Sequence, residues 1–540
     1  MSEADLFAAA ERLGVPGGRM ISGAFTGGKA KEVFLNTLAQ HYRDRPEKTA
    51  VELISDSGLL RVTYAQLERH VNRTADYLLS LGVKRGDRVA AQLPKSLPFI
   101  YFHLAAMQIG AIFLPLNPAY PEAELRYFLE DSGASVFIAD AEDQNIVDAV
   151  IDGLPADEMT SFIYKPQDIG AVWLADYSPR RRSPLPRDPN QTAMMLYTSG
   201  TTSRPKGARI THGNLTANIA ALHQAWGWRD DDVLLHVLPI FHVHGLVVAL
   251  HGALHAGATA VLTTSFEAAS TLDLLTSGRF SVFMAVPTMH RRLYQVAGEK
   301  RYDLSNMRLL TSGSDRLPDD LFFGYQRTFN VTLLERYGMT ETGMNLSNPL
   351  RGERRVGAVG KPLPGVSARI IDPGSGAALP DDQVGELQIK GDHVFAGYWR
   401  QPEKTAEAFT DDGWLRTGDL ALREPDGYYT LKGRAKDLII SGGLNIYPPE
   451  VELALMEHGA IAACAVIGCP DQEWGEQVVA VVVPHPGETI DSAEIIDYCR
   501  HQLAAYKAPR RVLVLDELPS NALGKVQKAK LRERCCPCLR

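Results

Sequence analysis

Strand-like and helix-like segments alternate along most of this chain, and the alternation limits what it can fold into. Arg88–Gln92 has the pattern of a short buried strand, Leu97–Gln108 that of a helix, and Ala111–Leu116 and Ser135–Ala139 those of two further strands. A second alternating region runs from Thr192 to about Asn330. Strands separated by helices usually pair in parallel and are covered by those helices. The sequence therefore predicts an α/β fold with parallel or mixed sheets and packed helices.

Two later changes of pattern divide the chain further. Short β-rich stretches run from Gly357 to Leu431, and a compact α+β pattern follows, with strands near Ala463–Ile467 and Val478–Val483 and a helix at Ser492–Ala504. A chain of 540 residues is expected to form more than one domain. We predict a loose segment over residues 1–30, a large N-terminal domain with a β-rich subdomain over 31–435, a small mobile C-terminal domain over 436–530, and a Cys-rich tail over 531–540.

Charge and hydropathy favour a cytoplasmic protein. The net charge of −8 gives no support for a nucleic-acid partner. No apolar run approaches the roughly 18 residues typical of a membrane-spanning helix. The N-terminal residues, with early acids and no long apolar stretch, do not have the pattern of a signal or transit peptide.

The cysteines do not form a recognisable metal site. Cys464, Cys469 and Cys499 are scattered, and we expect reduced thiols there. Three more crowd the final residues, CCPCLR, for which we expect a solvated tail. One isolated Cys-x-x-Cys without a second ligand pair is weak evidence for zinc.

The strongest local signal is the run YTSGTTSRPKGA over Tyr197–Ala208. Backbone N–H groups and hydroxyls in such a loop can bind phosphate oxygens, and Lys206 adds positive charge. The P-loop pattern is absent. Taken alone, the run could instead be a flexible surface turn, although phosphate binding is the favoured interpretation.

Four later segments favour the phosphate-binding interpretation: YGMTET (Tyr337–Thr342), TGD (Thr417–Asp419), GRAKDLIISGGLNIYP (Gly433–Pro448) and NALGKVQK (Asn521–Lys528). In their order and spacing they resemble the superfamily of adenylate-forming enzymes, which includes acyl-CoA synthetases, firefly luciferase and peptide-synthetase adenylation domains. The resemblance implies that superfamily's fold. It also implies an AMP-forming acyl-CoA synthetase that uses ATP, Mg²⁺ and coenzyme A to convert a carboxylic acid, through an acyl-adenylate, into its CoA thioester.

The resemblance also implies a role for each matching residue. ATP should be bound by Thr198, Ser199, Gly200, Thr201, Thr202, Lys206, Gly313, Ser314, Tyr337, Thr340, Asp419 and Arg434. Glu341 and Thr201 should hold the metal, and Lys525, Glu341 and Lys206 should act on the reacting groups. The acyl and CoA channel should include His242, Ser441, Gly442 and Gly443, with a hinge at Lys436. Ser203 stands where the family usually has Gly, so we expect slower or altered loop motion.

Two segments point to a small dicarboxylic substrate. LPIFHVHGL puts the additional polar residue His244 in a segment that would otherwise be an apolar wall. In VPTMHRRLYQVA, Pro287 starts a predicted helix whose apolar stripe is Met289, Leu293 and Val296.

Helical geometry then separates two neighbouring arginines. Arg291 points almost directly away from that stripe, whereas Arg292 lies only about 70° from its centre. An arginine beside an acyl pocket is costly unless a second substrate carboxylate pairs with it. The alternatives are a satisfied core histidine at His244, and an Arg292 that reaches water or pairs with a protein acid.

The segments Arg336–Ile370 and Val394–Phe409 resemble malonyl-CoA synthetases. This implies malonate or methylmalonate as substrate, with His244 and Arg292 at the distal carboxylate. The alternatives are a fatty or aromatic acid–CoA ligase of the same fold, a stand-alone adenylation enzyme with a separate carrier-protein acceptor, and a catalytically inactive binding protein. Nothing after Lys525 resembles a carrier domain.

Overall fold

The structure is a computed structural model, and it describes residues 33–56, 58–140, 160–164, 188–198, 205–520 and 525–539. Of residues 160–164 and 538–539 it describes the backbone alone. The predicted loose segment over residues 1–30 lies outside the described residues, as do Ser199, Gly200, Thr201, Thr202 and Ser203 of the phosphate loop.

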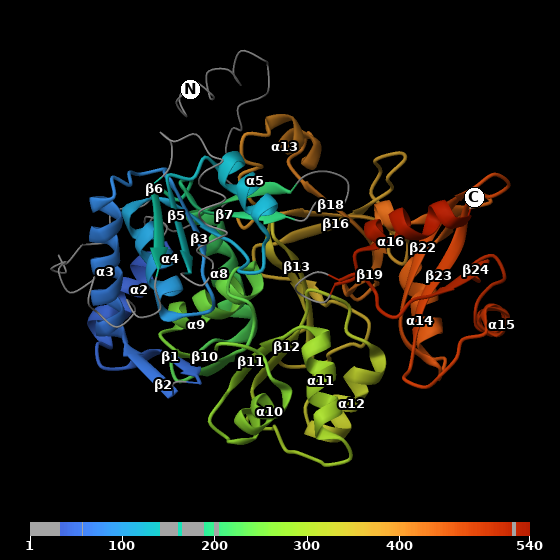
Figure 1. Ribbon diagram of the computed structural model, residues 1–540, viewed down its shortest axis with the longest axis horizontal. Helices are drawn as coiled ribbons and strands as arrows, with labels where there is room; N and C mark the ends of the chain where they lie inside the picture. The colour runs from blue at the N-terminus through green and yellow to red at the C-terminus, as the bar shows by residue number, and fades with distance from the viewer. Residues whose placement is uncertain are drawn as a thin grey trace. The chain divides into compact units, whose positions relative to one another are not determined.

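Two large sheets confirm the predicted α/β architecture (Figure 1). The first has nine strands and is parallel at its centre, with antiparallel strands toward both edges. Its order is β15 (Lys361–Pro362), β14 (Gly343–Ser347), β13 (Leu334–Met339), β12 (Leu309–Ser312), β11 (Val282–Ala285), β9 (Val233–His236), β10 (Thr259–Thr263), β1 (Thr49–Ser55) and β2 (Gly58–Thr63).

The second sheet has six strands and is parallel except for its last pair. Its order is β6 (Thr160–Tyr164), β5 (Val136–Asp140), β3 (Arg88–Gln92), β4 (Ile112–Pro115), β7 (Thr192–Thr198) and β8 (Lys206–Thr211). The three strands predicted here from their apolar runs are β3, β4 and β5, and each lies within a residue of its predicted bounds.

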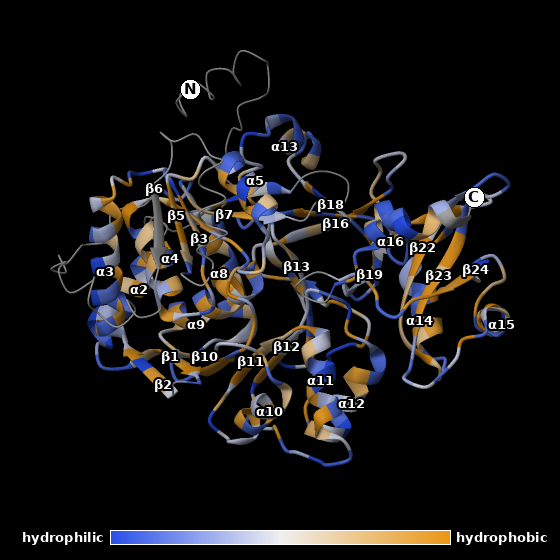
Figure 2. Cartoon of the chain, viewed as in Figure 1, coloured by the Kyte–Doolittle hydropathy of each residue, from blue (hydrophilic) through white to orange (hydrophobic). Residues whose placement is uncertain are grey.

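Helices pack on both faces of these sheets. They are α2 (Phe34–Asp44), α3 (Tyr64–Ser80), α4 (Leu97–Ile109), α5 (Glu122–Ser132), α8 (His212–Trp226), the π-helix η3 (His244–His251), α9 (Gly252–Ala256), α10 (Ala268–Thr276), α11 (Pro287–Ala297) and α12 (Asp319–Phe329). The largest apolar core joins α3, α4, α8 and η3 to strands of both sheets. A second core packs α10, α11 and α12 on the opposite face of the nine-stranded sheet, and Figure 2 shows the apolar strands in orange between these helices.

Capping residues fix where two of the core helices begin. The Thr63 side chain caps α3 and that of Thr211 caps α8, each in a reciprocal pair with the third helical residue, Gln66 and Asn214 respectively. Such pairs satisfy N–H groups that the first helical turn leaves without a partner. Because Thr211 is also the last residue of β8, the cap joins the strand after the phosphate loop directly to a core helix.

The remaining strands form two smaller sheets. A four-stranded antiparallel sheet contains β16 (Ser367–Ile371), β17 (Gly385–Lys390), β18 (Leu415–Arg423) and β19 (Tyr429–Arg434), and α13 (Pro402–Ala408) lies between β17 and β18 in the chain. A five-stranded sheet follows the short 3₁₀ turn η4 (Ala435–Asp437) and contains β20 (Ile439–Ser441), β21 (Leu444–Ile446), β22 (Ile461–Asp471), β23 (Gly475–Pro484) and β24 (Arg511–Val514). Its helices are α14 (Pro448–Met456), α15 (Ser492–Gln502) and α16 (Lys528–Cys535), followed by the turn η5 (Cys536–Leu539).

Two predictions about the cysteines are wrong, namely a reduced thiol at Cys469 and a solvated Cys-rich tail. Leu531 and Cys535 lie four residues apart, hence on one face of α16, and both are buried against β22 and β23. A disulfide joins Cys469 of β22 to Cys536 at the end of α16. The expectation failed because a bond across 67 residues of sequence is set by the tertiary fold, which local composition does not report.

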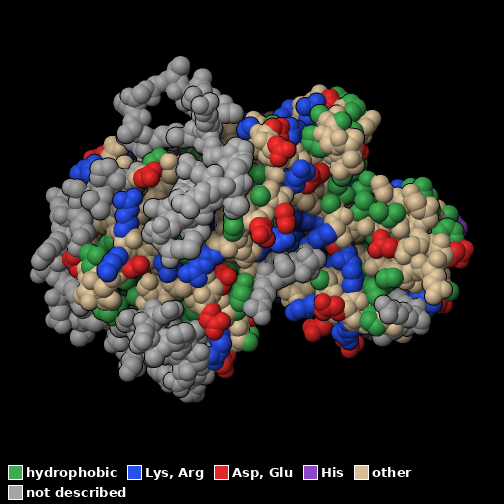
Figure 3. Space-filling view, turned by 90° about the horizontal axis from the view of Figure 1, so that it is seen from above, with side chains coloured by type: hydrophobic (Ala, Val, Ile, Leu, Met, Phe, Trp, Pro, Cys, Tyr) green, Lys and Arg blue, Asp and Glu red, His purple; other side chains and the backbone are tan. Residues whose placement is uncertain are grey.

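Charged side chains of both signs are mixed over the face seen in Figure 3, rather than separated into one basic and one acidic area. Within the described residues, no helix has the length and apolar character needed to cross a membrane.

Candidate functional site

The predicted nucleoside residues meet at the boundary between the large sheets and the β-rich sheet. The Tyr337 hydroxyl donates to Asp419 Oδ2 at 2.5 Å, and Arg434 Nε lies 2.7 Å from Asp419 Oδ1. Arg434 also donates to the Thr417 carbonyl at 3.2 Å. Burial, and then the negative charge of Asp419, raises the pKa of the Tyr337 hydroxyl well above its usual value, so the phenol stays protonated. These contacts fix three predicted ATP-binding side chains in one group.

A second group joins the phosphate loop to the predicted metal ligand. Lys206 Nζ lies 4.1 Å from the centre of the Tyr398 ring, and the Tyr398 hydroxyl donates to Glu341 Oε1 at 2.9 Å. Thr198 and Lys206, at the two ends of the loop, are paired across β7 and β8. Glu341 is buried, which raises the pKa of its carboxyl. The sequence predicts no role for Tyr398. The adjacent aromatic residues Tyr398 and Trp399, within the segment Val394–Phe409, could have indicated a functional position.

The third group lies where β12 and β13 end. Ser314, in the left-handed conformation at φ 72°, has its hydroxyl 3.3 Å from His244 Nδ1. A Cβ on Gly313 would lie 2.5 Å from the guanidinium of Arg336, so a larger residue at this position would force that guanidinium to move. Gly313 and Ser314 were predicted to border adenine, and the structure shows that they also contact the predicted substrate residue His244 and the neighbouring Arg336.

Arg336 is the residue that the sequence interpretation missed. Its side chain is 2% exposed, and its Nε, Nη1 and Nη2 have no hydrogen-bond partner. Burial lowers the pKa of the guanidinium to about 9, so it remains charged at neutral pH. A buried charge without a partner is costly, and such groups concentrate at ligand sites. The available signal was the adjacent charged pair Glu335 and Arg336 within β13, a strand that is buried over its first four residues.

The same face of the nine-stranded sheet carries further buried polar atoms without partners. His236 on β9, Thr311 on β12 and Arg336 on β13 share this face because the strands pair in register and side chains alternate. His236 Nδ1, Thr311 Oγ1 and His244 Nε2 all lack hydrogen bonds. Burial, and then the positive charge of Arg336, keeps the pKa of His244 well below its usual value, so the imidazole is neutral. Among the described residues, the charged guanidinium of Arg336 and these neutral polar atoms are thus buried without hydrogen-bond partners.

Arg292 is not where the sequence placed it. The buried residues of α11 are Pro287, His290, Leu293 and Ala297, whereas Val296 is 48% exposed. Arg292 is exposed, and Arg291 is half-buried and forms an ion pair with Asp320. The helix begins at Pro287 as predicted. Its buried face differs from the predicted stripe of Met289, Leu293 and Val296 because His290 packs inward. The two ring nitrogens of His290 bond the Tyr325 hydroxyl and the Thr311 carbonyl, so burial leaves neither of them without a partner.

His242, predicted to line the acyl and CoA channel, borders a narrow cavity of about 20 Å³. Tyr197, Thr340 and His242 line it from three separate segments. Burial lowers the pKa of the His242 imidazole to about 4, so this side chain is neutral at pH 7.

The predicted hinge lies in η4, between the β-rich sheet and the five-stranded sheet. Partial burial lowers the pKa of Lys436 to about 8; the negative charge of Asp437 opposes this shift, and the positive charge of Arg434 adds to it. Ser441, Gly442 and Gly443 form the β20–β21 turn, in which both glycines have left-handed φ values of 57° and 78°.

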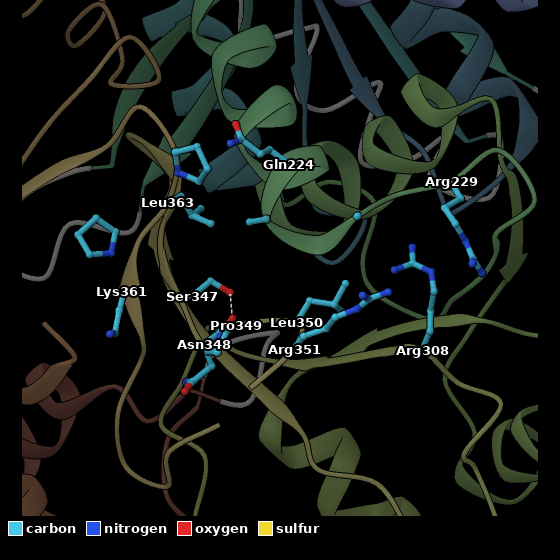
Figure 4. Close-up of a pocket in the computed structure, with 14 residues that line it drawn as sticks. Gln224, Arg229, Arg308, Ser347, Asn348, Pro349, Leu350, Arg351, Lys361 and Leu363 are labelled. Carbon is cyan, nitrogen blue, oxygen red and sulfur yellow. Dashed lines mark hydrogen bonds between the residues drawn. The ribbon is translucent and has the colours of Figure 1, made fainter. Parts of the chain in front are cut away.

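A larger hollow of about 560 Å³ lies elsewhere, between the end of α8 and the β14–β15 connection (Figure 4). Arg229, Arg308 and Arg351 line one side of it. Arg308 is already paired with Asp232. None of the predicted ATP-binding residues that the structure describes lines this hollow.

Comparisons with known proteins show the family to which this chain belongs. The AMP-binding enzyme family model matches residues 38–399, and the AMP-binding enzyme C-terminal domain model matches residues 450–525. The mitochondrial malonate–CoA ligase ACSF3 of Mus musculus is 37% identical over 94% of this chain and 91% of its own length. A feruloyl-CoA synthase of an Amycolatopsis species is 36% identical over 91% of this chain and 97% of its own length. The crystal structure of ATP-bound MatB from Rhodopseudomonas palustris is 39% identical over 94% of this chain and 100% of that chain, with a TM-score of 0.87.

The chain therefore belongs to the AMP-binding enzyme family, whose adenylate-forming fold combines a large mixed α/β N-terminal domain with a small C-terminal domain. Within that family it is an acid–thiol ligase of the AMP-forming acyl-CoA synthetase class.

Proposed function

We propose that this enzyme converts malonate, or methylmalonate, into its CoA thioester with release of AMP and pyrophosphate. The observation that carries the proposal is the buried guanidinium of Arg336, whose three nitrogens have no partner. A second substrate carboxylate would form a charge-assisted, bidentate pair with it. An apolar acyl chain would leave the charge unpaired in a region of low dielectric, which is strongly unfavourable.

The neighbouring groups suit a small dicarboxylate. His244 is neutral, and its Nε2 lies buried without a partner near Arg336, so this nitrogen can donate to the same carboxylate. The side chain of Ser314 holds the other ring nitrogen. We assign the distal carboxylate to Arg336 and His244. The exposed position of Arg292 speaks against a direct contact from that residue.

ATP would be bound by the groups described above. Asp419 would accept the ribose hydroxyls, and Tyr337 would border the adenine, while Lys206 and the loop from Thr198 would hold the phosphates. Magnesium in such sites is usually held by one or two carboxylates together with substrate phosphates. The buried Glu341 fits this role, since Tyr398 engages only its Oε1. Consistent with a metal shared with the nucleotide, the described residues hold no cluster of three or more metal-binding side chains.

The chemistry then follows from electrostatics. The substrate carboxylate attacks the α-phosphate, and pyrophosphate leaves. Lys525 would stabilise the charge that develops there, and a later rotation at Lys436 would bring the Ser441–Gly443 turn toward the CoA thiol. The thiol then displaces AMP from the acyl-adenylate, so no covalent enzyme intermediate is required.

The runner-up is a ligase for an aromatic or fatty acid, because the feruloyl-CoA synthase relative is as similar as the malonate ligase relative. A substrate screen separates the two proposals. Purified enzyme is given ATP, Mg²⁺ and CoA with malonate, methylmalonate, acetate, octanoate, benzoate or ferulate, and AMP formation is measured. We expect AMP only when both acid and CoA are present, with malonate or methylmalonate giving the highest kcat/KM. A preference for ferulate or octanoate would refute the dicarboxylate proposal, and ADP as product would refute the adenylate mechanism.

A further inference from the structure

The disulfide between Cys469 and Cys536 serves no step of the proposed reaction, yet it lies beside the element that carries the catalytic lysine. Cys469 is fully buried in β22, and Cys536 caps the end of α16 and is half-buried. Their Cα atoms are 5.3 Å apart. Lys525, the predicted catalytic lysine, lies in the segment before α16, three residues before the helix begins.

Helix α16 has further attachments, and one of them reaches the hinge. Arg532 Nη2 lies 2.6 Å from Asp437 Oδ1, and Asp437 directly follows the predicted hinge residue Lys436. Lys528 Nζ lies 2.6 Å from Glu452 Oε1 on α14. Leu531 is buried against strands β22 and β23. Helix α16 therefore connects the hinge turn, the catalytic-lysine segment and the sheet of the C-terminal domain.

These attachments differ in strength. The two ion pairs are partly exposed, and pairs of that kind contribute little to stability. An eight-residue helix is marginal by itself, so it depends on its tertiary contacts. The disulfide is the covalent attachment among them and holds the helix end that lies away from Lys525.

We propose that Cys469 and Cys536 form a reversible dithiol–disulfide modification site, which holds α16 in place and so positions Lys525 for the adenylate-forming half-reaction. Cystines in intracellular enzymes are often transient and redox-sensing. The inference rests on the proposed role of Lys525, and it adds a regulatory input to that role.

Formation of the bond needs an oxidant, for which we take a low-molecular-weight disulfide of the glutathione class. The thiolate of Cys536, the more accessible of the two, attacks one sulfur of the oxidant and releases one small thiolate. The thiolate of Cys469 then attacks the sulfur of Cys536 in the mixed disulfide and releases the second. Two protein thiols and one small disulfide thus give one protein disulfide and two small thiols, and two small thiols reverse the change.

The first measurement counts thiols in the full-length enzyme. Protein equilibrated with oxidised glutathione and then denatured should show four reactive thiols, because two of the six cysteines are bonded. Protein equilibrated with dithiothreitol should show six. Peptide mapping of the oxidised sample should recover the peptide that contains Cys469 joined to the one that contains Cys536. Six thiols in the oxidised sample, or a different pairing, would overturn the proposal.

The second measurement separates the half-reactions. Malonate-dependent exchange of pyrophosphate into ATP reports adenylation, and thioester formation from supplied acyl-adenylate reports transfer to CoA. Reduction should slow adenylation about tenfold or more, a loss in the range that small misplacements of catalytic groups produce. Thioester formation should change much less, because Lys525 is not needed there.

Matched variants test the mechanism. Cys536→Ser should adenylate at the rate of the reduced wild type and no longer respond to redox state, and Cys469→Ala should do the same. Cys464→Ser, on the same strand β22, should keep the response. Arg532→Gln should slow adenylation in the oxidised enzyme. A redox response that survives in Cys536→Ser, or equal effects on both half-reactions, would refute the proposal. If no acid supports adenylation in either redox state, the proposed function fails, while the thiol count still decides whether the site exists.

Discussion

Replacing Arg336 by Met should remove malonate activity and at the same time stabilise the enzyme without substrates. Arg336 is 2% exposed, and among the described residues no group forms a hydrogen bond with its guanidinium. Leaving a substrate carboxylate in that pocket without its cation should cost about 3–5 kcal/mol. At about 1.4 kcal/mol for each factor of ten, kcat/KM for malonate should fall by about 10²–10³-fold or more.

The stability change has the opposite sign. A methionine of similar length removes an unpaired buried charge, and replacing buried ionic groups by apolar ones often stabilises proteins by about 1–4 kcal/mol. The thermal unfolding midpoint of Arg336→Met should therefore lie above that of the wild type when no substrate is present. Circular dichroism or a dye-based melting curve measures this shift.

Two controls give this prediction a clear outcome. Acetate and propionate lack the distal charge, so their kcat/KM should change far less than that of malonate in Arg336→Met. Arg292→Ala, on the exposed side of α11, should leave malonate kinetics nearly unchanged. If Arg336→Met retains malonate turnover, or loses all acids equally, the assigned role is wrong. A selective loss in Arg292→Ala instead would restore the sequence-based assignment of that residue.

Three more predictions follow from the site and the core. Lys525→Ala should slow adenylation by about 10²–10³-fold, the effect of losing one preorganised electrostatic contact, and spare thioester formation from supplied acyl-adenylate; equal damage to both would contradict the assignment. Lys436→Pro should leave acyl-adenylate formation largely intact and block transfer to CoA, because proline removes backbone freedom at a hinge; an unchanged overall rate would mean the pivot lies elsewhere. Burial lowers the pKa of His236, His251 and His255 to about 3. In the unfolded chain the imidazole pKa values lie near 6.5, so between about pH 3 and pH 6.5 the unfolded chain binds more protons than the folded one. The free energy of unfolding should therefore be highest above about pH 6.5 and fall below it by about 1.4 kcal/mol per pH unit for each histidine. Urea unfolding at pH 7.5 and 5 measures the loss, and equal midpoints would refute it.

Sequence patterns predicted the elements that depend on local signals. Arg88–Gln92 forms its strand because a short apolar run is bounded by polar loops, and Pro287 begins α11 because its missing N–H costs nothing in the first turn. The order of the nucleotide-binding segments likewise placed Tyr337, Asp419 and Arg434 together, and the structure brings them into contact.

The features that depend on tertiary partners could not be derived in this way. An analysis of hydrophobic periodicity treats His290 as a polar residue and places it on the exposed face of the helix. It is buried, because the Tyr325 hydroxyl and the Thr311 carbonyl form hydrogen bonds with its two ring nitrogens. That contact rotates the buried face of α11 and turns Arg292 outward. In the sequence Arg336 is one of two adjacent charged residues of β13. Only the tertiary structure shows that its guanidinium is buried against Gly313 without a hydrogen bond among the described residues.

Overall similarity does not separate the candidate substrates, because a malonate ligase and a feruloyl-CoA synthase are 37% and 36% identical to this chain. The buried charge of Arg336 separates them on physical grounds. Specificity is a difference between free energies, and a site can achieve it by making the wrong ligand costly. An aromatic or fatty acyl group bound against this guanidinium would keep it from water without pairing it, whereas a dicarboxylate would supply the missing partner. We therefore expect one residue, Arg336, both to lower the stability of the enzyme without substrate and to select the substrate. The joint result that this reasoning requires is a loss of malonate activity together with a gain in thermal stability in Arg336→Met.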